Sequence, residues 1–142
     1  MEQSSEQNGQ KTILVVDDTP QVLEFVASVL KRGNLKVLFA GNGTDAFQLS
    51  QEYEGEIDLL LSDFQMPGMN GMELATALTA KRPRLQVLLM SGFDAGMLVL
   101  NEGWHFLPKP FISSTLLAIV MTLISSDRAS QFVEYPSPDA QS

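Results

Sequence analysis

The sequence has 142 residues, of which 44% are hydrophobic and 18% are charged, a composition typical of one globular domain and not of a disordered chain. Its 17 acidic and 9 basic residues give a formal net charge of −8, which repels a nucleic-acid backbone and argues against direct DNA or RNA binding. The chain has no cysteine, which excludes disulfides and thiolate metal sites, so a bound metal would need oxygen ligands.

Both ends of the chain differ from its centre. Residues 1–10 and 126–142 are polar, contain Ser and, in the second segment, Pro, and lack sustained periodicity, so we interpret them as flexible tails around a domain at residues 11–125. The sequence shows neither an apolar run of membrane-spanning length nor the pattern of a signal peptide, and a cytoplasmic location is therefore expected.

Apolar runs alternate with segments of helical periodicity along the domain. The first run, from Thr12 to Val16, is β-branched and aliphatic throughout, which is typical of a central parallel strand. Pro20 suits a first helical turn, and apolar residues continue at helical spacing until Gly33 closes the segment. The same alternation predicts strands at 35–39, 57–61, 85–90 and 104–107, helices at 43–53, 71–81 and 111–124, and at best a short helix at 94–101.

Strands interleaved with helices predict an α/β fold with a doubly wound, five-stranded parallel sheet and right-handed crossovers. In such a sheet, ligands bind outside the carboxyl ends of the strands. The polar residues that follow the predicted strands are Asp17, Asp18, Asp63, Ser91 and Lys109. Three carboxylates at close range repel one another unless a cation lies between them, and Mg²⁺ prefers such oxygen ligands.

The chain resembles the receiver domain of two-component response regulators over nearly all of residues 11–125. The stretches that carry the resemblance are 13–18, 58–63 with 66–71, 90–92 and 106–111, most of them at the end of a predicted strand. The resemblance implies a flavodoxin-like sheet with strand order 2-1-3-4-5. Residues 91–93 and 106–111 look most like receivers at the C-terminus of hybrid histidine kinases.

The resemblance also implies a phosphoacceptor site. Asp63 would take a phosphoryl group from the phosphohistidine of a histidine kinase or a phosphotransfer protein. Asp18, Asp63 and the backbone carbonyl of Gln65 would ligate Mg²⁺, and Asp17 would act through a coordinated water. Phosphoryl transfer depends on positioning and on neutralisation of the phosphoryl oxygens, and Mg²⁺ and Lys109 would supply that charge.

A conformational switch is the second implication of the resemblance. The hydroxyl of Ser91 would turn toward a phosphoryl oxygen, and Phe106 would move inward into the space that Ser91 leaves. A cis Lys109-Pro110 bond would aim Lys109 at the pocket. The switched surface would act on a downstream effector or relay protein, without direct contact to nucleic acid or membrane. Because residues 94–101 leave little room for a full helix, we expect a monomer or a weak dimer.

Several of these residues also have purely structural explanations. Asp18 alone would be interpreted as a cap for the helix that starts near Pro20, and Ser91 as part of a turn. His105 lies next to Phe106 on a short strand and should point to the opposite face, so no catalytic role is expected for it. We expect packing, and not a binding surface, from the methionines Met66, Met69 and Met72.

Two other functions share parts of this pattern. An aspartate-nucleophile phosphohydrolase would also use Asp and Mg²⁺, but such enzymes resemble Asp-x-Asp after the first strand, where this chain has adjacent Asp17 and Asp18. A pseudo-receiver would have the same fold and bind partners without phosphorylation, and the complete set of Asp18, Asp63, Ser91 and Lys109 argues against it. We expect a signalling phosphoacceptor without a DNA-binding output domain, either stand-alone or as a hybrid-kinase module.

Overall fold

A computed structural model describes residues 10–92 and 104–125. The described elements are β1 (Thr12–Val16), α2 (Pro20–Arg32), β2 (Lys36–Ala40), α3 (Gly43–Glu52), β3 (Leu59–Asp63), α4 (Gly71–Lys81), β4 (Gln86–Ser91), β5 (Trp104–Pro108) and α5 (Ser113–Ser125). The tails predicted at 1–10 and 126–142, apart from Gln10, and the short helix predicted at 94–101 lie outside the described residues. No helix in the described part of the chain combines the length and the apolar character that a bilayer crossing requires.

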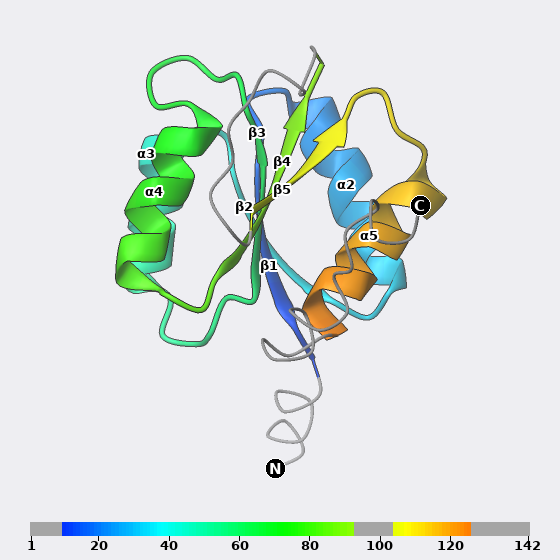
Figure 1. The fold of residues 1–142 in the computed structure, drawn as a ribbon, viewed down its shortest axis with the longest axis horizontal. Coiled ribbons are helices and arrows are strands. Elements are labelled where there is room, and N and C mark those ends of the chain that lie inside the picture. Colours follow the sequence, from blue (N-terminus) through cyan, green and yellow to red (C-terminus); the bar gives the residue numbers. More distant parts are fainter. Residues whose placement is uncertain (1–9, 93–103, 126–142) are drawn as a thin grey trace, which may run out of the picture.

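The strands form one parallel sheet in the order β2-β1-β3-β4-β5, which confirms the predicted fold class and strand order. Helices α3 and α4 cover one face of this sheet, and α2 and α5 cover the other (Figure 1). The chain leaves β1 toward β2 and then crosses back to β3 on the other side of β1. The strand order therefore reverses between β1 and β3, where a parallel α/β sheet binds its ligands.

An apolar cluster lies on each face of the sheet. Because side chains alternate along a strand, Ile13 and Val15 join the cluster under α2 and α5, whereas Leu14 and Val16 join the cluster under α3 and α4. All five residues of β1 are buried, and so are all five of β3. The two strands that lead to the predicted site are thus fixed by core packing on both sides.

Strand β3 extends further than its apolar pattern indicates. The prediction ended this strand at residue 61, but the ladder continues until Asp63, which stands opposite Met90 in β4. Phe64 prolongs the pairing, since its backbone N–H donates to the carbonyl of Met90 at 2.7 Å. Asp63 is therefore the last residue of a rigid strand and not the first residue of a loop. The other boundaries lie within two residues of their predicted positions.

Helix α2 ends at Arg32 with Gly33 as its C-cap, as the sequence predicted, but the left-handed residue is the next one. Gly33 has a φ of −90°, whereas Asn34 has a φ of 64°. The backbone N–H groups of Asn34 and Leu35 donate to carbonyls of the last helical turn, as in a Schellman motif with Asn in the left-handed position. A Cβ on Gly33 would lie 2.9 Å from Cδ1 of Leu117 on α5 and 3.4 Å from the carbonyl oxygen of Leu30, so the space beside Gly33 is tight and the Leu117 side chain would have to turn away.

Arg82, which directly follows α4, ties the end of this helix to the end of α3. Its guanidinium donates to the hydroxyl and the carbonyl of Ser50 and to the carbonyl of Tyr53, each at 2.9 Å, and to the carbonyl of Gly55 at 3.0 Å. A planar fork with several donors is required to reach these acceptors together. The contact lies at the end of the sheet opposite the predicted site.

We predict that Arg82→Lys lowers the free energy of unfolding by about 2 kcal/mol, because Lys keeps the charge but cannot satisfy the same acceptors. Urea denaturation followed by circular dichroism measures this change. Lys81→Ala, an exposed change one residue earlier, is the matched control and should cost less than about 0.5 kcal/mol. Equal losses in the two variants would contradict this role of the guanidinium.

Candidate functional site

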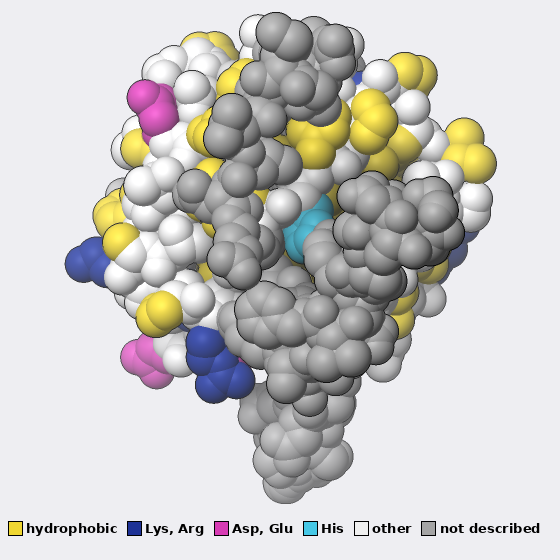
Figure 2. Space-filling view, in the orientation of Figure 1, with side chains coloured by type: hydrophobic (Ala, Val, Ile, Leu, Met, Phe, Trp, Pro, Cys, Tyr) yellow, Lys and Arg dark blue, Asp and Glu magenta, His cyan; other side chains and the backbone are white. Residues whose placement is uncertain are grey.

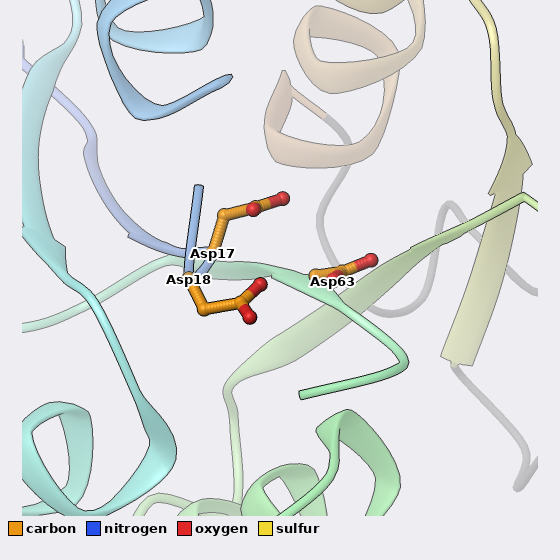
Figure 3. A group of neighbouring side chains, drawn as sticks. All are labelled: Asp17, Asp18 and Asp63. Atoms are coloured by element: carbon orange, nitrogen blue, oxygen red, sulfur yellow. The ribbon is translucent and has the colours of Figure 1, made fainter. Parts of the chain in front are cut away.

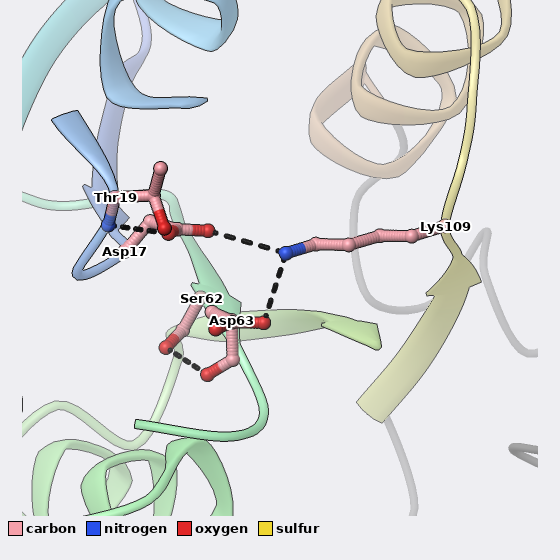
Figure 4. Close-up of polar contacts among 5 residues, drawn as sticks. All are labelled: Asp17, Thr19, Ser62, Asp63 and Lys109. Carbon is pink, nitrogen blue, oxygen red and sulfur yellow. Dashed lines mark hydrogen bonds and ion pairs between the residues drawn. The ribbon is translucent and has the colours of Figure 1, made fainter. Parts of the chain in front are cut away.

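The side chains of Asp17, Asp63 and Lys109 meet at the carboxyl ends of β1, β3 and β5. The Lys109 ammonium lies 3.1 Å from Oδ1 of Asp63 and 3.5 Å from Oδ2 of Asp17 (Figure 4). The backbone N–H of Lys109 donates to the carbonyl of Ser91 at 2.7 Å, so the start of the β5–α5 connection is tied to the end of β4. The Lys109-Pro110 bond is cis, as predicted.

Asp18 completes an acidic cluster with Asp17 and Asp63. One carboxylate oxygen from each residue lies within 4.8 Å of the other two (Figure 3). Asp17 is fully buried and Asp63 is 7% exposed, whereas Asp18 is open to solvent. Three carboxylates face the single positive charge of Lys109 in this group, and a hard divalent cation with oxygen ligands would balance the excess. The donor set therefore fits Mg²⁺.

Asp17 is held in place through both of its oxygens. Oδ1 accepts the backbone N–H of Thr19 at 2.9 Å, and Oδ2 faces Lys109 (Figure 4). Thr19 is the N-cap residue of α2, and Pro20 is its first helical residue, as expected. The structural explanation of Asp18 as a helix cap is wrong, because the carboxylate of Asp17 takes the backbone N–H at this turn. Asp18 is the solvent-exposed member of the acidic cluster.

The pKa values of Asp63 and Lys109 are both raised in the folded protein, for different reasons. Burial raises the pKa of Asp63 above its usual value, and the negative charge of Asp17 adds to this, against the lowering effect of Lys109. Burial alone would lower the pKa of Lys109, but its contacts with Asp63 and Asp17 outweigh burial and raise it. Lys109 therefore stays charged at neutral pH.

The raised pKa of Asp63 has a consequence for stability. The folded protein holds a proton on this carboxyl more strongly than the unfolded chain does. The contribution of the protonated carboxyl to folding stability is therefore complete below the pKa of the unfolded state and is lost as the pH rises through the pKa of the folded state. At neutral pH, the ionised form of Asp63 thus opposes folding. A cation bound between the carboxylates would reduce this cost.

The remaining predicted site residues lie around this centre. Ser91 is the buried last residue of β4, and Gln65 is exposed in the loop that follows Asp63. Phe106 stands opposite Leu89 in the sheet and packs, half-buried, against the cluster under α3 and α4. The predicted movements of Ser91 and Phe106 stay predictions.

Two residue types that could suggest other sites have structural roles. His105 points to the face of the sheet opposite to Phe106, as predicted, which is the face where Leu107 belongs to the cluster under α2 and α5. Burial lowers the pKa of His105. The methionines pack as expected: Met66 is a buried member of the cluster under α3 and α4, and the partly buried Met69 and Met72 pack against it.

Sequence reasoning missed the residues that support the backbone next to Asp63. The hydroxyl of Ser62 donates to the carbonyl of Asp63 at 2.9 Å (Figure 4). Asn70 and Glu73 form a capping box that fixes the start of α4. The pattern Asn-x-x-Glu before a helix could have indicated this cap. No comparable signal in the sequence distinguishes Ser62 from any other strand residue.

A five-stranded parallel sheet of this order, with an acidic cluster and a lysine at its carboxyl edge, defines the class of receiver domains. The family model described as the response regulator receiver domain matches residues 13–121, and the chain belongs to this family. It is thus a receiver domain of two-component signal transduction. The class carries a general phosphoacceptor role, binds Mg²⁺ at an acidic pocket, and interacts with histidine kinases or phosphotransfer proteins and with effectors.

Similar proteins carry such a domain within longer chains. The sensor kinase CckA of Brucella abortus is 29% identical over 128 residues, which cover 87% of this chain and 14% of that protein. The transcriptional regulatory protein LnrK of Bacillus subtilis is 35% identical over 119 residues, which cover 80% of this chain and 53% of that protein. The chain therefore spans about half, or far less, of the length of these relatives.

The chain is also similar to solved structures of receiver domains, which it matches over nearly their whole length. The receiver domain of the hybrid histidine kinase CckA is 33% identical with a TM-score of 0.71, over 80% of this chain and 98% of that one. A receiver domain from Clostridium thermocellum is 25% identical with a TM-score of 0.74, over 81% of this chain and 94% of that one. The predicted similarity to receivers of hybrid histidine kinases is confirmed.

Proposed function

We propose that Asp63 is the phosphoacceptor of a two-component phosphorelay. The observation that carries this proposal is the position of its carboxylate at the end of a central strand, 3.1 Å from the Lys109 ammonium and within the acidic cluster. A carboxylate oxygen of Asp63 forms the new bond to phosphorus while the bond from phosphorus to the donor imidazole nitrogen breaks. The imidazole leaves as the neutral ring once it has taken up a proton.

The other site residues neutralise and orient the transferred group. Asp18, Asp63 and the backbone carbonyl of Gln65 would hold Mg²⁺, with Asp17 acting through a water. When bound, Mg²⁺ supplies positive charge to the phosphoryl oxygens. Lys109 exchanges its contact with Asp63 for one with a phosphoryl oxygen, and the hydroxyl of Ser91 donates to another. Such a site works by positioning and charge and not by acid–base catalysis.

Exposed apolar side chains beside the site support a protein as the phosphodonor. Phe25 on α2 is 41% exposed and Ile112 before α5 is 66% exposed, and the rings of Phe25 and Phe111 pack with centroids 6.4 Å apart. Figure 2 shows hydrophobic side chains exposed at the upper right, on the side of the molecule where α2 and α5 lie, and others on the opposite side over α3 and α4. Aromatic and aliphatic groups exposed together are typical of protein contact surfaces. A histidine kinase or a phosphotransfer protein fits this surface.

Metal binding is tested by the thermal stability of the protein. Millimolar Mg²⁺ should raise the unfolding midpoint, because a ligand that binds only the folded state stabilises it and this cation relieves the repulsion in the cluster.

Asp18→Asn should weaken Mg²⁺ binding about tenfold or more in calorimetry, since it removes a charged ligand. Asp45→Asn, at an exposed position on α3, is the control. Equal Mg²⁺ affinity in both variants would contradict a metal site at Asp18.

Phosphorylation is tested with a small-molecule phosphodonor such as acetyl phosphate. The wild-type protein should gain one phosphoryl group by intact mass measurement in the presence of Mg²⁺, and a chelator should prevent the gain. A wild-type protein that binds Mg²⁺ but gains no phosphate would overturn the proposal in favour of a pseudo-receiver. Turnover of a general phosphatase substrate at many cycles per second would instead point to a phosphohydrolase.

A further inference from the structure

The carbonyl group of Asp63 lies between two supports that none of the roles above uses. On one side, the fully buried Ser62 donates its hydroxyl to this oxygen at 2.9 Å. On the other side, Gly71 packs against it, and a Cβ on Gly71 would lie 2.5 Å from the Asp63 oxygen and 3.0 Å from Cα of Phe64. Real Cβ atoms do not approach backbone atoms to 2.5 Å, so only glycine allows helix α4 to start here.

The peptide groups that follow are held as well. The N–H of Phe64 donates to the carbonyl of Met90 at 2.7 Å, and the N–H of Gly71 donates to the carbonyl of Phe64 at 2.8 Å. The capping box of Asn70 and Glu73 fixes the helix end from which Gly71 acts, with bonds of 2.8 and 2.9 Å. The backbone at Asp63 and Phe64 is therefore bonded to β4 on one side and to α4 on the other, directly before Gln65.

We propose that Ser62 and Gly71 are positioning residues of the phosphoacceptor site. Together they fix the carbonyl of Asp63 and, through it, the direction in which the chain continues to Gln65. The carboxylate of Asp63 and the carbonyl of Gln65 are thereby presented to the same metal ion. This inference rests on the proposed function, in which both groups are Mg²⁺ ligands.

The energetic reason lies in the geometry that Mg²⁺ demands. This ion accepts only near-octahedral ligands at short distances, so a small rotation of the Asp63 peptide costs affinity. The Ser62 hydroxyl opposes such a rotation with a hydrogen bond, and the Cα of Gly71 opposes it with a close contact. Neither residue needs to touch the ion or the phosphoryl group.

The first test is Ser62→Ala, which removes the hydroxyl without adding any atom. Calorimetry should show Mg²⁺ binding about three- to tenfold weaker, the equivalent of one lost buried hydrogen bond. Ser62→Thr keeps the hydroxyl and should restore the affinity to within about twofold of wild type. Ser50→Ala is the matched control, because Ser50 is also buried and its hydroxyl accepts from Arg82 at the other end of the sheet. That control should lose stability in urea without losing Mg²⁺ affinity.

The second test compares alanine substitutions at two glycines, one in contact with the Asp63 backbone and one in open space. Gly71→Ala forces a Cβ against the backbone of Asp63, and its Mg²⁺ affinity should fall about tenfold or more. In Gly41→Ala, the new Cβ lies directly after β2 and meets no atom within 4 Å. Its Mg²⁺ affinity should stay within about twofold of wild type.

The outcomes separate this inference from the proposed function. If the wild-type protein binds Mg²⁺ and gains phosphate while Ser62→Ala binds Mg²⁺ equally well, the inference is overturned and the function stands. The inference also fails if Ser50→Ala loses as much Mg²⁺ affinity as Ser62→Ala does. A wild-type protein that binds no Mg²⁺ overturns both. Should Gly71→Ala fail to fold, the three serine variants decide the question alone.

Discussion

Asp63→Asn is expected to reduce phosphate incorporation from acetyl phosphate about a hundredfold or more, to below detection by intact mass. The neutral amide keeps the shape of the side chain but lacks the negatively charged oxygen that attacks phosphorus. It also removes one of the three carboxylates of the acidic cluster. The measurement is the fraction of phosphorylated protein with time, at saturating Mg²⁺ and donor.

A matched control lies at the other end of the same segment. Asp58 directly precedes β3, and its carboxylate accepts the backbone N–H of Thr12 at 2.8 Å. Asp58→Asn removes the same charge and keeps an acceptor oxygen, so it should be phosphorylated like wild type. Phosphorylation of Asp63→Asn at the wild-type level would show that another residue accepts the group.

The stability of Asp63→Asn separates lost chemistry from lost folding. Since burial and the charge of Asp17 raise the pKa of Asp63, its ionisation opposes folding at neutral pH, and the amide removes that cost. Without metal, the unfolding midpoint of this variant should equal or exceed that of wild type. A large drop in the midpoint would mean that the Lys109 contact outweighs the cost of burial.

Lys109→Ala is expected to slow phosphate incorporation about 10- to 100-fold, because the transferred group loses a positive charge aimed at its oxygens. Mg²⁺ affinity should change much less than this rate, since Lys109 is not a metal ligand. The same mass assay measures the rate, and calorimetry measures the affinity. Lys81→Ala, at the exposed end of α4, serves as the control for charge alone.

Removal of the Lys109 ammonium should also destabilise the metal-free protein. The ammonium is the positive charge that the carboxylates of Asp17 and Asp63 face. Without it, two buried carboxylates have no charged partner, which is unfavourable. Added Mg²⁺ should recover part of this loss. In the absence of metal, the unfolding midpoint of Asp63→Asn should therefore equal or exceed that of wild type, whereas the midpoint of Lys109→Ala should be lower. An unchanged phosphorylation rate and an unchanged phosphorylation-dependent output in Lys109→Ala would refute the proposed role of this residue.

Local pattern and strand geometry were sufficient for most of the site. Apolar runs located the strands, and the polar residues after them had to meet because parallel strands end at one edge. Asp17, Asp63 and Lys109 are therefore brought together as predicted, with Asp18 in the same cluster. The end of β3 was misplaced because hydrophobicity cannot tell a polar residue inside a ladder from one in a loop.

The sequence by itself thus determined the βα alternation, the parallel sheet and the acidic edge, because periodicity and residue type are local properties. Only the tertiary structure decided which small and polar residues support that edge. The contact of Gly71 with the Asp63 carbonyl depends on where α4 starts, and the tight space beside Gly33 depends on how α5 packs. The Arg82 contacts reach across some thirty residues of chain. Such roles arise from the distance between atoms far apart in the chain, which composition and spacing do not encode.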